Sequence, residues 1–153
     1  MSDSDFQALL RRLGEAIGVA SLEADDDNYC LLTVDDEREI SIEFDAERDA
    51  LILSIGCGTL RQPASVETLT ELLAANYHWI GSGGGTLSLY GQGEVALQIS
   101  VPVAQLEVEQ LKDLLEALVH NAEFWCERLQ AEGNGTTVEK SAVPDERWPG
   151  LRV

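Results

Sequence analysis

The sequence predicts an α+β fold in which helices pack on a twisted antiparallel sheet, in the order α-β-β-β-α-β-β-α. Apolar residues recur at helical spacing in three segments and at strand spacing in five. Short polar links join successive predicted strands, which implies antiparallel neighbours because parallel strands need long crossovers. The helices come before, between and after two runs of strands, an arrangement typical of a sheet covered by helices.

The first predicted helix begins near Ser4 and ends near Gly18. Ser4 and Gln7 have the spacing of a capping box, in which a hydroxyl and an amide satisfy two free backbone donors. Gly18 suits the left-handed end of a helix. The apolar residues share one face, as expected for a helix that packs on a sheet. They are Phe6, Leu9, Leu10, Leu13 and Ile17.

Three strands are predicted between residues 29 and 60. Tyr29 to Val34 is almost continuously apolar, whereas residues 40–44 alternate apolar with polar side chains. The third strand starts at Leu51 and runs towards Leu60. The links 35–38 and 45–49 are acidic and short enough for hairpins.

A second helix is predicted from Ser65 to Ile80, where the glycine-rich residues 81–85 end it. Two more strands follow at residues 86–90 and 95–101, separated by a Gly-Gln-Gly sequence that suits a tight hairpin.

The last predicted helix starts after Pro102 and continues past Leu129. The predicted domain spans residues 1–132, because a chain of 153 residues is the usual size of one domain and can bury a core without disulfides or metals. Residues 133–153 are polar and rich in Gly and Pro, and are interpreted as a flexible tail in which Trp148 is large enough to dock elsewhere.

The chain is strongly acidic, with 28 Asp plus Glu against 10 Lys plus Arg and a formal net charge of −18. This field repels phosphate backbones and anionic lipids, so neither nucleic acid nor a membrane is an expected partner. It favours solubility and rapid encounter with basic proteins. We expect a cytoplasmic protein, because no signal-peptide pattern or membrane-spanning apolar run is visible. The odd number of cysteines (Cys30, Cys57 and Cys126) also fits a reducing compartment.

No motif predicts a catalytic or metal site, so we expect a binding protein without a cofactor rather than an enzyme. Residues 81–85 lie between a helix and a strand, the reverse of a dinucleotide-binding motif, and no Lys follows them as in a phosphate loop. Asp25 to Asp27 lacks the alternating ligands of a calcium loop. His78 and His120 lie on different predicted helices without zinc-ligand spacing. A Cys–His pair that meets only in the fold stays an open alternative.

The stretch from Leu72 to Leu89 resembles the central signature of the class I type III secretion chaperones, the family of the Tir chaperone. It contains Leu-Leu-Ala-Ala-Asn, then aromatic and apolar residues, a run of glycines and a strand beginning Thr-Leu. The Val101-Pro102 pair and a Leu-rich last helix ending in Phe124-Trp125 also resemble the family. The resemblance covers roughly residues 4–132 and implies a bacterial cytoplasmic homodimer with the fold predicted above.

The same resemblance implies two binding surfaces. The first is a two-fold interface made by the second helix and the strand after it. Its expected residues are Leu72, Leu73, Asn76, Tyr77, Trp79, Ile80, Leu87 and Leu89. The second is a groove that binds the extended N-terminal segment of a secreted effector and keeps it soluble for export. Its expected residues are Leu10, Leu13, Ile17, Tyr29, Leu31, Ile40, Ile42 and Phe44.

Three other functions stay open. The same fold would serve a regulatory domain that binds a folded partner, and deletion of the partner's N-terminal segment separates that function from a secretion chaperone's. An acidic mimic of nucleic acid would bind a basic protein with strong salt dependence, whereas apolar anchoring persists in salt. An enzyme would need a ligand pocket that the sequence does not indicate.

Overall fold

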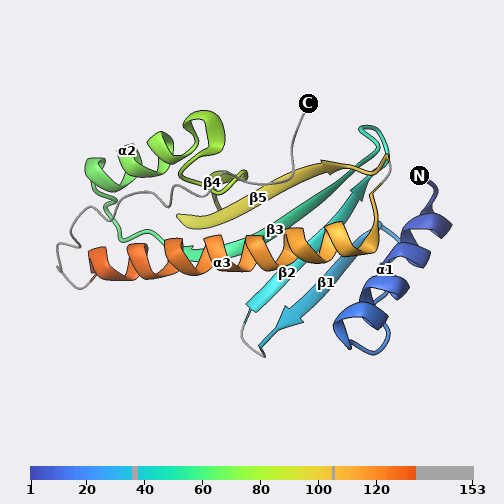
Figure 1. Cartoon of the computed structure of the whole chain (residues 1–153). Coiled ribbons are helices and arrows are strands. Elements are labelled where there is room, and N and C mark those ends of the chain that lie inside the picture. The colour runs from blue at the N-terminus through green and yellow to red at the C-terminus, as the bar shows by residue number, and fades with distance from the viewer. Residues whose placement is uncertain (36–37, 105, 134–153) are drawn as a thin grey trace. The chain divides into compact units, whose positions relative to one another are not determined.

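The computed structural model describes residues 1–35, 38–104 and 106–133 (Figure 1). Five strands form one sheet in the order β1-β2-β3-β5-β4, and the hairpin pairs within it are antiparallel. The predicted α+β class and element order are confirmed. The elements are α1 (Asp3–Ile17), β1 (Tyr29–Val34), β2 (Arg38–Asp45), β3 (Ala50–Thr59), α2 (Val66–Ala75), the 3-10 turn η1 (Tyr77–Trp79), β4 (Thr86–Tyr90), β5 (Glu94–Pro102) and α3 (Val108–Gly133).

The described residues group into two compact units, each made of two stretches of chain. Unit 1 comprises residues 1–55 and 99–119, and unit 2 comprises residues 56–98 and the described residues from 120 onwards. β3, β5 and α3 each contribute one part to each unit. The predicted domain boundary after residue 132 stays a prediction, and the tail with Trp148 lies outside the described residues.

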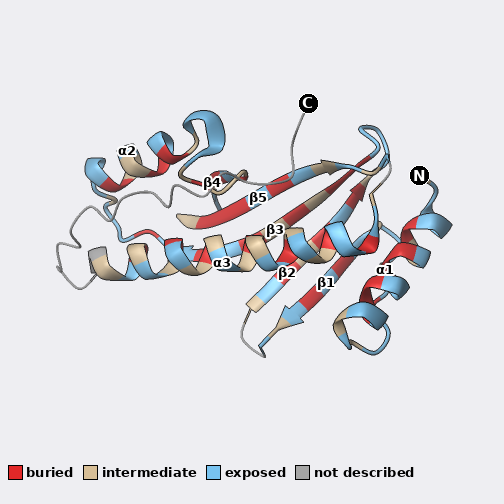
Figure 2. Cartoon of the chain, viewed as in Figure 1, coloured by how far each residue is buried: buried red, intermediate tan, exposed pale blue. Residues whose placement is uncertain are grey.

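In unit 1, the apolar face of α1 packs against β2 through Phe6 and Phe44. The rings of Phe6 and Phe44 lie 5.7 Å apart, and Leu10 and Leu13 are fully buried. Figure 2 shows buried stretches along α1 and along β1, β2 and β3. Ile42 of β2 is also fully buried. Burying each side chain of this size contributes about 1.5–3 kcal/mol to the stability of unit 1.

Both ends of α1 are capped. The helix is capped by Ser2, whose side chain accepts from the Asp5 N–H while the Asp5 carboxylate accepts from the Ser2 N–H at 3.0 Å. The prediction of Ser4 and Gln7 as the capping box was wrong, because the box lies two residues earlier. Gly18 ends the helix in the left-handed conformation with a φ of 75°, as predicted.

In unit 2, α2 ends at Ala75, five residues before the predicted end at Ile80. The helical spacing of apolar residues continues past Ala75, but the backbone does not. His78 and Trp79 have φ angles of 52° and 55°, in the left-handed region that side chains disfavour. The chain therefore leaves the helical path at η1 and continues into the glycine-rich residues.

The glycine-rich segment of unit 2 is required by close packing. A Cβ atom at Gly81 would lie 2.8 Å from the Cα atom of Ala75, and one at Gly83 would lie 2.3 Å from the side chain of Asn121. Gly83 also has a φ of +65°. Ser82, fully buried between them, donates its hydroxyl to the Gly85 carbonyl. The glycines therefore allow a tight chain reversal, which explains them without a phosphate site.

A half-buried ion pair joins α2 to α3 within unit 2. Arg128 Nε donates to Glu71 Oε1 at 3.0 Å, and its Nη2 donates to Glu71 Oε2 at 2.5 Å. A two-point fork of this kind fixes orientation as well as distance. It holds the α2 helix in place beside the exposed residues described below.

We expect Gly83→Ala to lower the free energy of unfolding by about 1–3 kcal/mol, because the new methyl group meets Asn121 and the positive φ is strained. Gly56→Ala is the matched control, since nothing lies within 4 Å of its Cβ position. Urea unfolding followed by circular dichroism measures both. Equal stability of the two variants would contradict the packing role of Gly83.

Candidate protein-binding sites

The predicted groove residues do not form one surface. Five of them are buried in the core of unit 1: Leu10, Leu13, Ile40, Ile42 and Phe44. Ile17 is half-buried, and only Tyr29 and Leu31 are exposed, by 39% and 46%. A partner that binds the folded chain can therefore contact Ile17, Tyr29 and Leu31, but not the five buried residues.

The pairing register of β1 with β2 explains this separation. Tyr29 lies opposite Glu43 and Leu31 lies opposite Ser41, whereas Cys30 lies opposite the buried Ile42. Successive side chains of a strand point to opposite faces. Tyr29 and Leu31 therefore belong to the outer face of the sheet, and the buried groove residues of β2 belong to the inner face. The predicted groove placed both sets on one surface, whereas the register puts them on opposite faces of the sheet.

The β1 strand also presents its backbone, because it is the edge strand of the described sheet. The Tyr29 N–H donates to Asp25 Oδ1 and the Tyr29 carbonyl accepts from the Asp25 N–H, both at 2.9 Å. The Tyr29 backbone thus points away from β2. Backbone direction alternates along a strand, so the N–H and C=O groups of Leu31 and Thr33 point the same way. They form a row of donors and acceptors on which a further strand can add.

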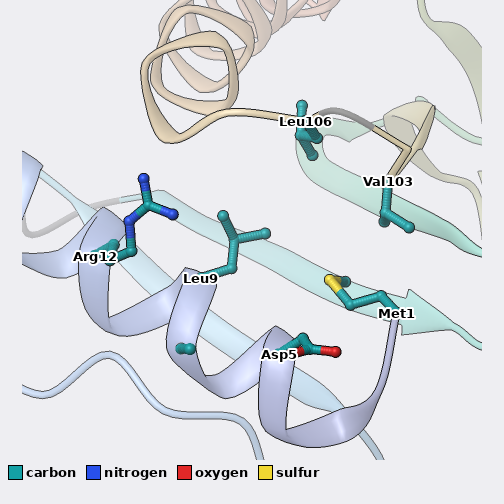
Figure 3. A pocket seen from close by; sticks show the side chains of 7 residues that line it. Met1, Asp5, Leu9, Arg12, Val103 and Leu106 are labelled. Atoms are coloured by element: carbon teal, nitrogen blue, oxygen red, sulfur yellow. The ribbon is translucent and has the colours of Figure 1, made fainter.

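A second feature of unit 1 is a hollow of about 250 Å³ between α1 and the link from β5 to α3 (Figure 3). Leu9 on α1 faces Val103 and Leu106 across it, and Arg12 lies at its rim within 3.7 Å of Glu107. The hollow is smaller than the roughly 300–1,000 Å³ of small-molecule sites, so it suits one apolar side chain better than a cofactor. The lining residues are Met1, Asp5, Ala8, Leu9, Arg12, Val103 and Leu106.

The predicted dimer residues all lie in unit 2, and most of them are exposed. Leu73 and Tyr77 are each 73% exposed and Ile80 is 65% exposed. Trp79 and Leu89 are about half exposed, at 55% and 50%. Leu72 and Leu87, by contrast, are buried core residues. An apolar group of this density on one compact unit is typical of a surface that another protein covers.

Asn76, the eighth predicted dimer residue, bonds within its own chain. Its Nδ2 donates to the Leu87 carbonyl at 3.0 Å, and its Oδ1 accepts from the Leu87 N–H at 2.8 Å. Leu87 lies on β4, the other edge strand of the described sheet. The amide thus takes the place of a neighbouring strand at this residue. Beside it, Trp79 Nε1 donates to Thr86 Oγ1 at 3.3 Å, which helps hold the strained η1 turn.

The cysteines give no indication of a catalytic site. Cys30 and Cys57 are buried and Cys126 is half-buried. Burial, together with the charge of Asp25, raises the pKa of the Cys30 thiol above its usual value. A raised pKa reduces the thiolate fraction that a nucleophile needs. Within the described part of the chain, no three His, Cys, Asp or Glu residues are grouped as metal ligands, and no helix is long and apolar enough to cross a bilayer.

Some exposed apolar residues were not predicted from the sequence. Val66 and Tyr90 of unit 2 are 80% and 55% exposed. Val66 continues the exposed face of α2 about two helical turns before Leu73, and this spacing was available as a signal. The hollow had no such signal, because its walls are distant in sequence.

Comparisons with known proteins identify the family to which this fold belongs in this chain. Residues 8–126 match the model of the Tir chaperone protein (CesT) family. The transcriptional anti-antiactivator ExsC of Pseudomonas aeruginosa is 28% identical over 147 residues, which cover 88% of this chain and 92% of ExsC.

Solved structures show the same fold. The ExsC–ExsE complex matches with a TM-score of 0.73 and 26% identity, over 83% of this chain and 95% of that chain. The HopA1–SchA chaperone–effector complex matches with a TM-score of 0.69 and 21% identity, over 83% of this chain and 99% of that chain.

We expect Asn76→Ala to lower the free energy of unfolding by about 1–3 kcal/mol, because it leaves the Leu87 N–H and C=O without the Asn76 side chain. Asn76→Asp keeps the acceptor for the Leu87 N–H but sets a carboxylate oxygen against the Leu87 carbonyl oxygen, so it should also destabilise the chain. Hydrogen exchange at the Leu87 amide should accelerate in Asn76→Ala. An unchanged exchange rate would show that Asn76 does not protect the edge of β4.

Proposed function

The chain belongs to the Tir chaperone protein (CesT) family, and from this premise we propose that it is a cytoplasmic type III secretion chaperone. Its activity is to bind the extended N-terminal segment of a secreted effector and keep that segment soluble and competent for export. This is a binding function, which involves no reaction and no cofactor. ExsC, the relative found in complex with ExsE, supports a protein ligand.

The observation that carries this proposal is the open edge of β1. An extended segment can add as a further strand there, because the backbone groups of Leu31 and Thr33 point outwards. Tyr29 and Leu31 offer apolar contacts on the outer face beside this edge. The hollow beside Leu9 supplies a place for an apolar anchor in the same unit. An extended ligand loses entropy on binding, so several such contacts are needed along its length.

We propose further that two copies of the chain pair through the exposed apolar residues of unit 2. Leu73, Tyr77 and Ile80 are large, apolar and exposed in one chain, and burying them in a second copy removes them from water. Aromatic residues are enriched in such interfaces. The effector site lies in unit 1 and the pairing site in unit 2, so the two can be tested separately.

A second candidate function is regulation of transcription through a protein partner. It is favoured by the relative ExsC, a transcriptional anti-antiactivator. The tagged chain should be purified from its native host and the co-purifying protein identified by mass spectrometry. Loss of binding when the N-terminal segment of a secreted partner is deleted supports the chaperone function. A regulatory partner bound regardless of such a deletion would favour the second candidate.

We expect Leu73→Asp to convert the dimer into a monomer, because the carboxylate would be buried without a partner in the interface. Leu31→Asp is the reciprocal control, since it changes an exposed residue of unit 1. Light scattering on a sizing column should give one chain mass for Leu73→Asp and two for Leu31→Asp. A dimeric Leu73→Asp variant would remove Leu73 from the interface.

We expect Thr33→Pro to weaken effector binding by about tenfold, because it removes a backbone N–H that points to the added strand. Thr33→Val is the matched control, since it keeps the N–H and the branched side chain. Calorimetric titration with the co-purified effector segment measures both variants, and circular dichroism checks their fold. If both bind like the wild type, the segment does not pair with β1 at this residue.

A further inference from the structure

We propose that the protein segment added to β1 carries Lys or Arg two residues before and two residues after an apolar residue, so that the three side chains share one face of the added strand. This inference rests on the proposed function and specifies the chemistry of the partner. One cation would lie opposite Thr33 on the outer face, and the apolar residue would lie opposite Leu31. The second cation would approach the Tyr29 ring and Glu43 where the segment leaves β1, because the Tyr29 backbone is already bonded to Asp25. The evidence is the arrangement of exposed side chains in two strands of unit 1.

The outer face of β1 and β2 has a regular pattern across the strands. Tyr29 lies beside Glu43, Leu31 beside Ser41 and Thr33 beside Glu39. Both glutamates are exposed, and Ser41 is half-buried. The central pair, Leu31 with Ser41, is therefore uncharged and partly apolar. Each of the two flanking pairs has a carboxylate on β2.

A cation on an added strand can reach these carboxylates. Neighbouring strands are about 4.8 Å apart, so the added strand lies roughly 10 Å from β2. Lys or Arg and Glu cover this distance together with their extended side chains. Thr33 between them is small, which leaves the path to Glu39 open. The exposed ring of Tyr29 offers an attractive face to a cation on its way to Glu43.

The strands themselves do not neutralise this charge on the outer face. Arg38, the single cation in β1 and β2, lies opposite Val34 and therefore belongs to the inner face. Arg48, in the next turn, is bound to Asp45. At the start of β1, the exposed residues 25–27 add three further aspartates. A partner segment with acidic residues would be repelled here, and a neutral one would form no ion pair with the glutamates.

The test uses three synthetic peptides of twelve residues with a fluorescent label. The first repeats Lys-Thr-Val-Thr, which places Lys and Val alternately on one face of a strand. The other two replace each Lys by Gln or by Glu. Fluorescence anisotropy measures their binding to the full chain at low and high salt. We expect the Lys peptide to bind most tightly, and the Glu peptide not to bind.

Two double variants of the full chain locate the effect. Glu39→Gln with Glu43→Gln should weaken binding of the Lys peptide about five- to tenfold at low salt, and flatten its salt dependence. Glu109→Gln with Glu127→Gln removes the same charge from exposed positions of α3, and should leave the affinity nearly unchanged. Circular dichroism verifies the fold of each.

Three results would overturn the proposal. The Lys and Gln peptides could bind the wild-type chain equally well, or the α3 variant could lose as much affinity as the β2 variant, which would indicate only the overall charge. The three peptides could also fail to bind while the co-purified effector segment binds with its affinity unaffected by the Glu39 and Glu43 changes. In that third case the chaperone function stands and the basic pattern is wrong.

Discussion

The register between β1 and β2 is the constraint on which the binding surface of unit 1 depends. With Cys30 opposite Ile42, the even-numbered residues of β1 enter the core and the odd-numbered ones face outwards. A shift by one residue would bury Tyr29 and Leu31 and expose Cys30 and Leu32, which exchanges core and surface. Because α1 packs on the inner face through Phe6 and Phe44, the core itself holds this register.

The types and order of the elements were predictable from the sequence because they depend on local periodicity. Tyr29–Val34 and Thr86–Tyr90 are strands with the predicted bounds. Helix ends were harder to predict. Two overlapping capping patterns begin at Ser2 and Ser4, and only the fold chooses between them. The apolar spacing of Tyr77 and Ile80 also continues that of α2, although the backbone leaves the helix before them.

The binding residues were predictable only in part, because exposure depends on pairing between strands. For unit 2, the resemblance to the family pointed to Leu73, Tyr77 and Ile80, which are exposed in the structure, and their place in a dimer interface stays a prediction. For unit 1, it merged two faces of a sheet, since no local pattern gives the register of β1 with β2. The role of Asn76 at the β4 edge depends on a contact across eleven residues and was not visible either.

The two edges of the sheet differ, because Asn76 covers β4 at Leu87 whereas β1 is open at Leu31 and Thr33. This difference has a consequence for assembly. A sheet with two free edges can join the β1 edge of one copy to the β4 edge of the next, a head-to-tail contact that does not close and so builds fibres. Asn76 makes that contact costly, because an incoming strand must displace both of its hydrogen bonds with Leu87. Addition of a further strand is therefore directed to β1, where one added segment completes the sheet. A protein that handles unfolded chains can thus stay protected against polymerising with itself.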